Sequence, residues 1–282
     1  MAQSVDPRIS ARLRAIRPQQ EENASFWLIL SEADDGCAVW LTEEMRKRTR
    51  QPVMHLTTHD LAQTARAERG IDADGPWFSM TTLEGRTVHS RRLLGVVNRL
   101  VPASHPCGGR PQAMIGSAAE TPESRMQPLL RWLESWTGPV INRPMGFGPG
   151  TTLLPAAWWM EQAIAVGFLG ADDGGRAGAG ADEPRTRVAV VGDGVCSMAT
   201  PGAAVPEALE WRCLRLARSA SATVLGVSAS RAADGNWRFL EADLCPDLRL
   251  CGEAAAELLV KSLLRQATAN GDAVEGAEAG PG

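Results

Sequence analysis

Two acidic residues near the C-terminus have a spacing suited to metal binding. Glu241 and Asp243 stand two positions apart in the run Phe239–Leu248, which has the pattern of a strand end. Residues two apart in a strand point to the same face, with Cα atoms about 6.5 Å apart, so both carboxylates can reach one divalent cation. The alternative interpretation is a pair of hydrated carboxylates at a strand end.

The dipeptide Asn-Arg follows an apolar run twice, at Asn98-Arg99 and at Asn142-Arg143. Each pair taken alone is typical of a loop that begins with a capping Asn. Two such pairs at the ends of two predicted strands indicate one rim of a crevice at the carboxyl edge of a sheet.

Three further patterns favour structural roles. His55 and His59 have the spacing of paired zinc ligands on a helix, but His55 lies in a predicted strand, which favours a surface or turn role. The Gly-rich run 146–150 lacks the Gly-Lys-Ser/Thr ending of a phosphate-binding loop, which favours a connector. The six cysteines form no Cys-x-x-Cys pair, so we interpret them as reduced thiols. A cysteine-based metal or redox protein is one of three functional hypotheses; the other two are given below.

The composition argues against several classes of protein. The chain has 282 residues and a net charge of −4, with no dense basic block, which argues against a dedicated nucleic-acid binder. No apolar run approaches the roughly 18 residues of a membrane helix, and the first twenty residues lack the apolar core of a signal peptide. We therefore expect a cytoplasmic protein. Lys occurs only at positions 47 and 261, so lysine chemistry has two candidates.

The elements that must position these residues begin with alternating strands and helices. Short apolar runs predict strands at 26–30, 53–56 and 94–97, and helical spacing predicts helices up to Arg50 and over Leu61–Glu68. This alternation predicts a parallel sheet covered on both faces. Between them, Glu84-Gly85 predicts the turn of a hairpin.

The rest of the chain has a different order of elements. A helix over 126–136, a strand at 139–142 and a Trp-rich helix from Pro155 to Gly167 come first. The sequence then predicts hairpin, helix, hairpin and helix, typical of an α+β module. A Gly-rich segment, 170–185, is a predicted flexible linker, and 1–24 and 268–282 are predicted disordered tails.

The C-terminal third resembles glutathione-synthetase-like ATP-grasp ligases. The runs Arg187–Val195, Val224–Ser228 and Trp237–Pro246 follow the order of that family's last strands. The resemblance implies that Glu241 and Asp243 hold magnesium against the ATP phosphates, Asp243 at a position where the family has Asn. It also implies cofactor-binding roles for Arg187, Asn142 and Arg143, since the Asn-Arg runs resemble strand ends of the domain that precedes the ATP-grasp domain.

The sequence also departs from this family in two places, and these departures are as informative as the match. The interval between Gly167 and Arg187 is about twenty residues long and contains no Lys, whereas the family has a lid there that covers the nucleotide with a Lys. Ser228 also stands where the family has Asp. We therefore expect an α/β protein: a Rossmann-like pre-ATP-grasp domain over 25–120, and an ATP-grasp-like α+β domain over 121–267 that lacks the lid.

Without the lid, much of what would bind and align ATP is missing. The resulting hypothesis is a catalytically degenerate ATP-grasp-like binding or assembly subunit, with no catalytic residue and no cofactor expected. The alternative is an active ATP-dependent carboxylate–amine ligase that uses ATP and Mg²⁺ and receives its lid from another chain. We expect a protein partner or a homodimer, with an interface at Trp158 and Trp159, because adjacent Trp residues cannot both face the same core.

Overall fold

The computed structural model describes residues 24–73, 75–100, 122–144, 154–170 and 185–269. Both predicted tails and the Gly-rich run at 146–150 therefore lie almost entirely outside the described residues. Of the predicted linker 170–185, only its two end residues are described. Within the described residues, no helix combines the length and apolarity that crossing a membrane requires.

The N-terminal part contains a four-stranded parallel sheet, as the alternation of strands and helices predicts. In spatial order its strands are β2 (Val53–Thr57), β1 (Phe26–Ser31), β6 (Leu93–Arg99) and β7 (Val140–Ile141). Strand periodicity divides the side chains of β1 between two cores: Trp27 and Ile29 enter one, and Phe26, Leu28 and Leu30 enter the other. Both faces of the sheet are therefore buried.

Helices cover the two faces of this sheet. The first face packs against α2 (Gly36–Arg48) and α7 (Glu253–Ala269), which contribute Leu41, Met45 and Leu259 to its core. The second face packs against α3 (Thr58–Ala62) and α4 (Pro122–Ser135), which contribute Leu61 and Leu133.

A small antiparallel sheet replaces part of a predicted helix. Helix α3 ends at Ala62, and Thr64–Asp72 forms strand β3, so the predicted helix over Leu61–Glu68 is wrong beyond its first two residues. The reason is tertiary: β3 pairs along its length with β4 (Gly75–Thr82), which pairs with β5 (Thr87–His89), followed by the 3-10 turn η1 (Ser90–Arg92). The predicted hairpin turn at Glu84-Gly85 is confirmed, and Gly85 has a φ of 81°.

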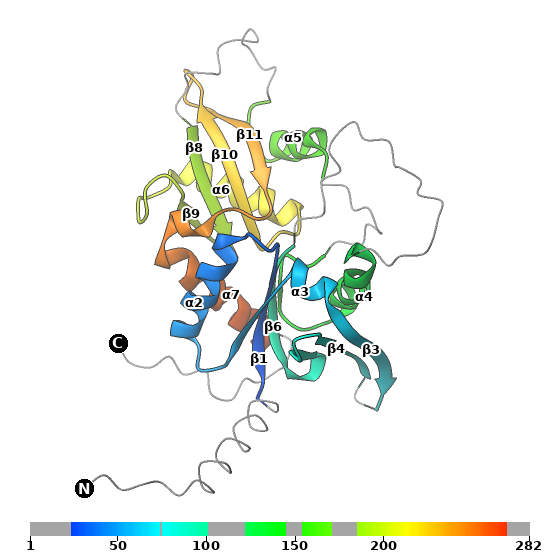
Figure 1. Cartoon of the computed structure of the whole chain (residues 1–282). Helices are drawn as coiled ribbons and strands as arrows, with labels where there is room; N and C mark the ends of the chain where they lie inside the picture. The colour runs from blue at the N-terminus through cyan, green and yellow to red at the C-terminus, as the bar shows by residue number, and fades with distance from the viewer. Residues whose placement is uncertain (1–23, 74, 101–121, 145–153, 171–184, 270–282) are drawn as a thin grey trace, which may run out of the picture.

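The C-terminal part forms a second four-stranded sheet, which is antiparallel throughout. Its strands in spatial order are β11 (Trp237–Asp243), β10 (Val224–Arg231), β8 (Arg185–Val191) and β9 (Gly194–Ser197). Helices α5 (Ala156–Ala165) and α6 (Glu207–Ser219) pack against one face of this sheet. In Figure 1, α6 lies behind β8 and β10. The predicted order of hairpin, helix, hairpin and helix is confirmed.

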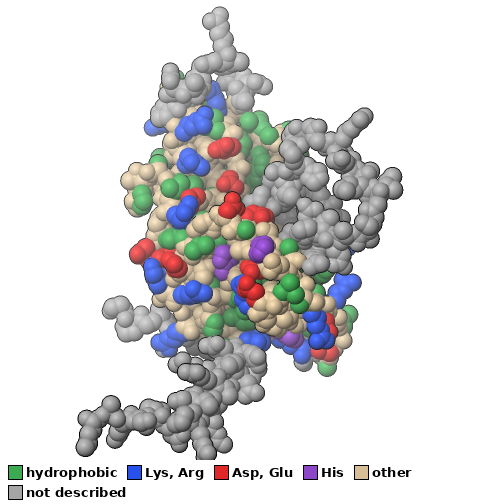
Figure 2. Space-filling model, viewed as in Figure 1, with side chains coloured by type: hydrophobic (Ala, Val, Ile, Leu, Met, Phe, Trp, Pro, Cys, Tyr) green, Lys and Arg blue, Asp and Glu red, His purple; other side chains and the backbone are tan. Residues whose placement is uncertain are grey.

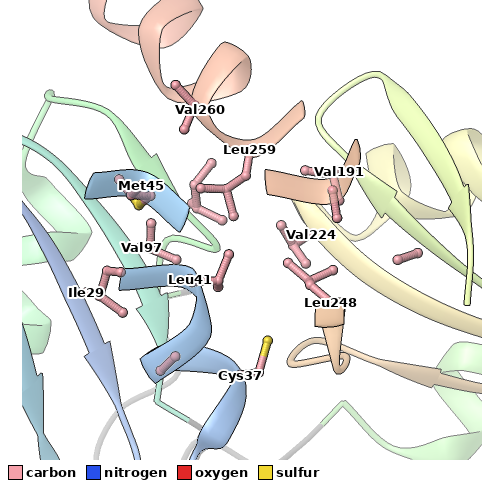
Figure 3. Close-up of a cluster of buried hydrophobic side chains, with 14 of the residues drawn as sticks. Ile29, Cys37, Leu41, Met45, Val97, Val191, Val224, Leu248, Leu259 and Val260 are labelled. Atoms are coloured by element: carbon pink, nitrogen blue, oxygen red, sulfur yellow. The ribbon is translucent and has the colours of Figure 1, made fainter. Parts of the chain in front are cut away.

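One core joins the two four-stranded sheets. Ile29 and Val97 of the parallel sheet share a cluster with Val191 and Val224 of the antiparallel sheet. Leu248, in the 3-10 turn η2 (Leu248–Cys251), lies between them and is fully buried. Figure 3 shows these side chains converging from both sides of the cluster. The two sheets are therefore held in a fixed arrangement by apolar packing.

Candidate functional site

One face of the antiparallel sheet is apolar, and the other face is polar only in part. On that second face Ala189, Val191 and Val224 belong to the core shared with the parallel sheet, and the charged part around Ser228 is called the polar face below. Val188, Val227 and Phe239 point into the core with α5 and α6. Ser228 alternates with Val227 and so points to the opposite face, where it is paired with Arg187 of β8 and with Glu241 of β11. Figure 2 shows, over this sheet, basic side chains on the β8 side and acidic side chains on the side of β10 and β11. Charged groups of both signs therefore share this face.

A β-bulge decides where the two carboxylates point. Phe239 pairs with Ala229 but Glu241 pairs with Ser228, so Leu240 is an extra residue in β11. In an unbroken strand Glu241 would point to the same side as Phe239, into the apolar core. The bulge turns Glu241 to the polar face, where Asp243, two residues further on, joins it and both side chains are exposed.

The two carboxylates each keep one oxygen available. Glu241 Oε1 accepts a hydrogen bond from Ser228 Oγ at 2.9 Å, and Asp243 Oδ1 accepts one from the Cys245 N–H at 2.8 Å. The second oxygen of each accepts no hydrogen bond from the described residues. This donor set fits Mg²⁺, which binds through one or two carboxylates together with phosphate and water. Among the residues that the structure describes, no group of three or more His, Cys, Asp or Glu side chains could hold a metal ion.

Arginines occupy the other part of the polar face. Arg187 and Glu241 both pair with Ser228, from opposite sides, which places their Cα atoms roughly 10 Å apart. Ser230, one pleat further along β10, pairs with Arg185 of β8 and with Arg238 of β11. An anion bound between these arginines and a cation at Glu241 and Asp243 would neutralise both sets of charges.

Asn142 lies at the junction of the two sheets. Its Nδ2 donates to the carbonyls of Val224 at 2.9 Å and Leu244 at 2.7 Å. Its Oδ1 accepts from the N–H groups of Thr223 at 3.0 Å and Val224 at 2.8 Å. These four bonds use every donor and acceptor of the amide. Asn142 therefore reaches the backbone that follows β11, and its side chain is fully engaged by backbone groups.

Arg143 lies at the end of α4. Its guanidinium donates to the carbonyls of Leu133 at 2.6 Å and Gly138 at 2.9 Å and to that of Trp136. It therefore caps the Leu133 carbonyl in the last turn of α4 and holds two carbonyls of the segment that follows the helix. Burial lowers the pKa of this guanidinium. The structure thus places Asn142 and Arg143 in backbone contacts, and it places Arg187, Glu241 and Asp243 together on the polar face.

The sequence placed Arg99 in the predicted rim without a role of its own, and it gave no signal for the partner of Arg99, Asp35. Arg99 is 6% exposed, and its Nε donates to Asp35 Oδ2 at 2.7 Å. Burial is the largest single influence and opposes the charge, but the hydrogen bond to Asp35 and the electrostatic attraction of Cys37, Asp35 and Cys245 together outweigh it and raise the pKa of Arg99. The repeated Asn-Arg dipeptide was the available signal; its partner Asp35 lies 64 residues away in the chain.

The adjacent tryptophans of α5 have different environments. Trp159 is 7% exposed and belongs to the core beneath the antiparallel sheet, while Trp158 is half-buried and packs against that core. Their rings meet edge to face at 5.0 Å. The two residues do divide between core and surface, and the partner at Trp158 stays a prediction.

The histidines and cysteines form no shared site in the described chain. His55 is a strand residue and its Nε2 lies 2.8 Å from Ser31 Oγ, whereas His59 of α3 contacts Gln63, the residue that follows this helix. The five described cysteines are free thiols, and Cys251 Sγ lies 4.0 Å from the Cys196 carbonyl.

Solved structures of other proteins share this arrangement of elements. The chain matches a RiPP-associated ATP-grasp ligase from Chryseobacterium gregarium, in complex with ADP and a leader and core peptide, with a TM-score of 0.59 and 11% identity over 84% of this chain and 97% of that one. The chain shares its fold with ATP-grasp ligases. The macrocyclase MdnC from Microcystis aeruginosa, bound with precursor peptide MdnA, also matches with a TM-score of 0.59 and 11% identity over 84% and 100% of the two chains.

A third match is to a protein whose structure was determined with magnesium. The ATP-grasp ligase PsnB, complexed with a minimal precursor variant, Mg and ADP, matches with a TM-score of 0.56 and 17% identity over 86% of this chain and 99% of that one. No protein-family model matches the sequence, and no curated protein matches it either. The fold implied by the sequence motifs is thus confirmed. The deletion of the lid stays a prediction, because residues 171–184 lie outside the described chain.

Proposed function

We propose that this protein is an ATP-dependent carboxylate–amine ligase that binds the nucleotide phosphates on the polar face of β8, β10 and β11. The observation that carries the proposal is the bulge at Leu240, which brings Glu241 and Asp243 onto the face that also carries Arg187. An active ligase is the alternative hypothesis that the sequence motifs left open. It becomes the main one because the solved structures of the same fold are named as ligases.

The residues of the polar face have distinct roles in this proposal. Bound magnesium would supply the positive charge that offsets the developing negative charge of phosphoryl transfer. The free oxygens of Glu241 and Asp243 would hold that ion, and Ser228 Oγ keeps the Glu241 carboxylate oriented. Arg187, across β10, would donate to phosphate oxygens. In this class of reaction the substrate carboxylate attacks the terminal phosphorus of ATP, ADP leaves, and the amine displaces phosphate from the acyl phosphate.

The substrate in this proposal is a peptide. The Chryseobacterium gregarium ligase, MdnC and PsnB are described with leader, core or precursor peptides. A peptide supplies both reacting groups, a side-chain or terminal carboxylate and an amine. This part of the proposal rests on likeness of fold and is tested separately, by incubating the chain with ATP and candidate precursor peptides.

Calorimetric titration of the purified chain with ATP in the presence of Mg²⁺ tests nucleotide binding. We expect saturable binding by the wild type and at least tenfold weaker Mg²⁺-dependent binding by Glu241→Gln and Asp243→Asn, because each removes one charged ligand. Asp193→Asn is the matched control, since Asp193 lies in the β8–β9 turn of the same sheet and pairs with Arg265. Failure of the wild type to bind up to millimolar ATP would contradict the proposal.

Two features favour a second function: no lysine lies on the polar face, and only two carboxylates of the described residues are available there to bind a metal ion. Lys47 pairs with Glu44 on α2 and Lys261 lies on α7, so no lysine of this chain stands on the polar face. We propose as the second candidate a degenerate binding or assembly subunit whose interface with its partner includes Trp158. It predicts a stable complex or homodimer without ATP turnover, which size-exclusion chromatography with light scattering and a phosphate-release assay distinguish from the ligase.

A further inference from the structure

Three consecutive backbone carbonyls directly after β11 are held by side chains of the parallel-sheet part. The Leu244 carbonyl accepts from Asn142 Nδ2 at 2.7 Å. The Cys245 carbonyl accepts from Arg99 Nη2 at 3.3 Å, and the Pro246 carbonyl accepts from Arg99 Nη1 at 3.1 Å. The segment that follows Glu241 and Asp243 is therefore fixed to the carboxyl ends of β6 and β7.

The side chains that hold this segment are themselves held. Asp35 accepts from Arg99 Nε and also caps α2, accepting from the N–H groups of Cys37 at 2.9 Å and Ala38 at 3.1 Å. Asn98 Nδ2 donates to the Asn142 carbonyl at 2.9 Å, which secures a backbone with a φ of 52°. The segment thus takes its position from α2, β6 and β7 together.

The same segment orients one of the two carboxylates. The Cys245 N–H donates to Asp243 Oδ1 at 2.8 Å while the Cys245 carbonyl is held by Arg99. On the other side, the segment has no room to move toward β10, because a Cβ added at Gly226 would lie 2.8 Å from Pro246 Cβ. A shift of the segment would therefore turn the Asp243 carboxylate.

We infer that Arg99 and Asn142 are positioning residues: by fixing the carbonyls of residues 244–246, they set the orientation in which Asp243 binds a divalent cation beside Glu241. The inference rests on the proposed function, because it assumes that these carboxylates bind a cation. It assigns to Arg99 and Asn142, one residue from each Asn-Arg pair, a role through the protein backbone in place of direct contact with a ligand.

Arg99→Lys is the most informative substitution. Lysine keeps the positive charge next to Asp35, but its single ammonium group lacks the planar fork that reaches a carboxylate and two carbonyls at once. Arg86→Lys is the matched control, since Arg86 likewise bonds an aspartate, Asp60, at 2.6 Å and a backbone carbonyl, that of His55, at 3.1 Å. The hydrogen-bond partners of Arg86, which are His55, Asp60 and Glu84, do not belong to the segment 241–247.

Two measurements test the inference. Hydrogen exchange at the Cys245 amide should accelerate at least tenfold in Arg99→Lys and stay unchanged in Arg86→Lys. The Mg²⁺ concentration that half-saturates the ATP-dependent rise in Tm should increase at least tenfold in Arg99→Lys alone. Should Arg99→Lys not fold, Asp35→Asn gives the same readouts, because Asn keeps the N-cap of α2 and removes the charge that fixes Arg99.

The outcomes separate the inference from the proposed function. A wild-type chain without any Mg²⁺ response overturns the proposed function and with it the cation-positioning role. A wild-type response that Arg99→Lys retains in full, or exchange at Cys245 that stays at the wild-type rate, overturns this inference alone.

Discussion

Asn142 combines an unfavourable backbone with four favourable hydrogen bonds. Its φ of 52° lies in the left-handed region, which Asn tolerates better than other non-Gly residues. Its side chain satisfies backbone groups at the start of β10 and after β11 that water would otherwise have to reach.

Replacing Asn142 separates these two contributions. We expect Asn142→Ala to lower the free energy of unfolding by about 3 kcal/mol, because it leaves polar groups without partners and keeps the unfavourable φ. Asn142→Gly should lose about 1 kcal/mol less, since Gly adopts this φ without strain. Urea denaturation measures both. Equal losses would show that the backbone conformation contributes nothing.

His55 predicts a dependence of stability on pH. Burial lowers the pKa of His55 below its ordinary 6.5, so the unfolded chain takes up a proton at a higher pH than the folded chain. The stability contribution of the neutral ring is complete above pH 6.5 and is lost as the pH falls toward the pKa of the folded state. Between pH 7.5 and 5.5, the wild type should lose more stability than His55→Gln. Parallel stability profiles would contradict this assignment.

At the scale of the element, the two adjacent Trp residues of α5 allow core packing and association to be tested separately. Trp159 is 7% exposed in the core beneath the antiparallel sheet, and Trp158 is half-buried. We expect Trp159→Ala to lower the free energy of unfolding by about 3–5 kcal/mol, as large-to-small changes in cores do. Trp158→Ala should cost clearly less.

The same pair of variants tests the predicted interface. If Trp158 contacts a partner or a second copy of the chain, Trp158→Ala should weaken association while the Tm stays near that of the wild type. Analytical ultracentrifugation at several concentrations measures the association. A wild type that stays monomeric at high concentration removes the basis for an interface between two copies.

The bulge in β11 shows what strand patterns can predict. The spacing of Glu241 and Asp243 indicates that they share a face, and the structure places both on the polar face. The pattern does not indicate which face, because Leu240 is an unremarkable apolar residue and the bulge arises from pairing with β10. Similarly, the residues from Thr64 onward are a strand because β4 lies beside them, which local helical spacing cannot reveal.

At the scale of the whole molecule, the shared core predicts cooperative unfolding. Leu259 of α7 is fully buried in the cluster that contains residues of both four-stranded sheets. Leu259→Ala should lower the free energy of unfolding by about 2–5 kcal/mol and keep a single transition. Far-ultraviolet circular dichroism and tryptophan fluorescence should give coincident curves. Two separate transitions would show that the sheets unfold independently.

The sequence by itself determined most elements and the fold. Apolar runs and helical spacing are local signals, so they located the parallel strands, the Trp-rich helix and the C-terminal hairpins, and the motif order indicated the ATP-grasp fold that the solved structures confirm. The residue types also determined that Glu241 and Asp243 offer carboxylates to one face of a strand.

Only the tertiary structure decided how these parts work together. Arg99 reaches carbonyls 146 and 147 positions away, and Asn142 reaches a carbonyl 102 positions away. Contacts of this range depend on how two sheets dock, and docking depends on the shapes of the packed side chains. Spacing along the chain reflects the periodicity of a strand or a helix, and it does not specify how two sheets dock. The Asn-Arg pairs, from which a crevice rim was predicted, therefore supply Arg99 and Asn142, whose side-chain bonds join the two sheets.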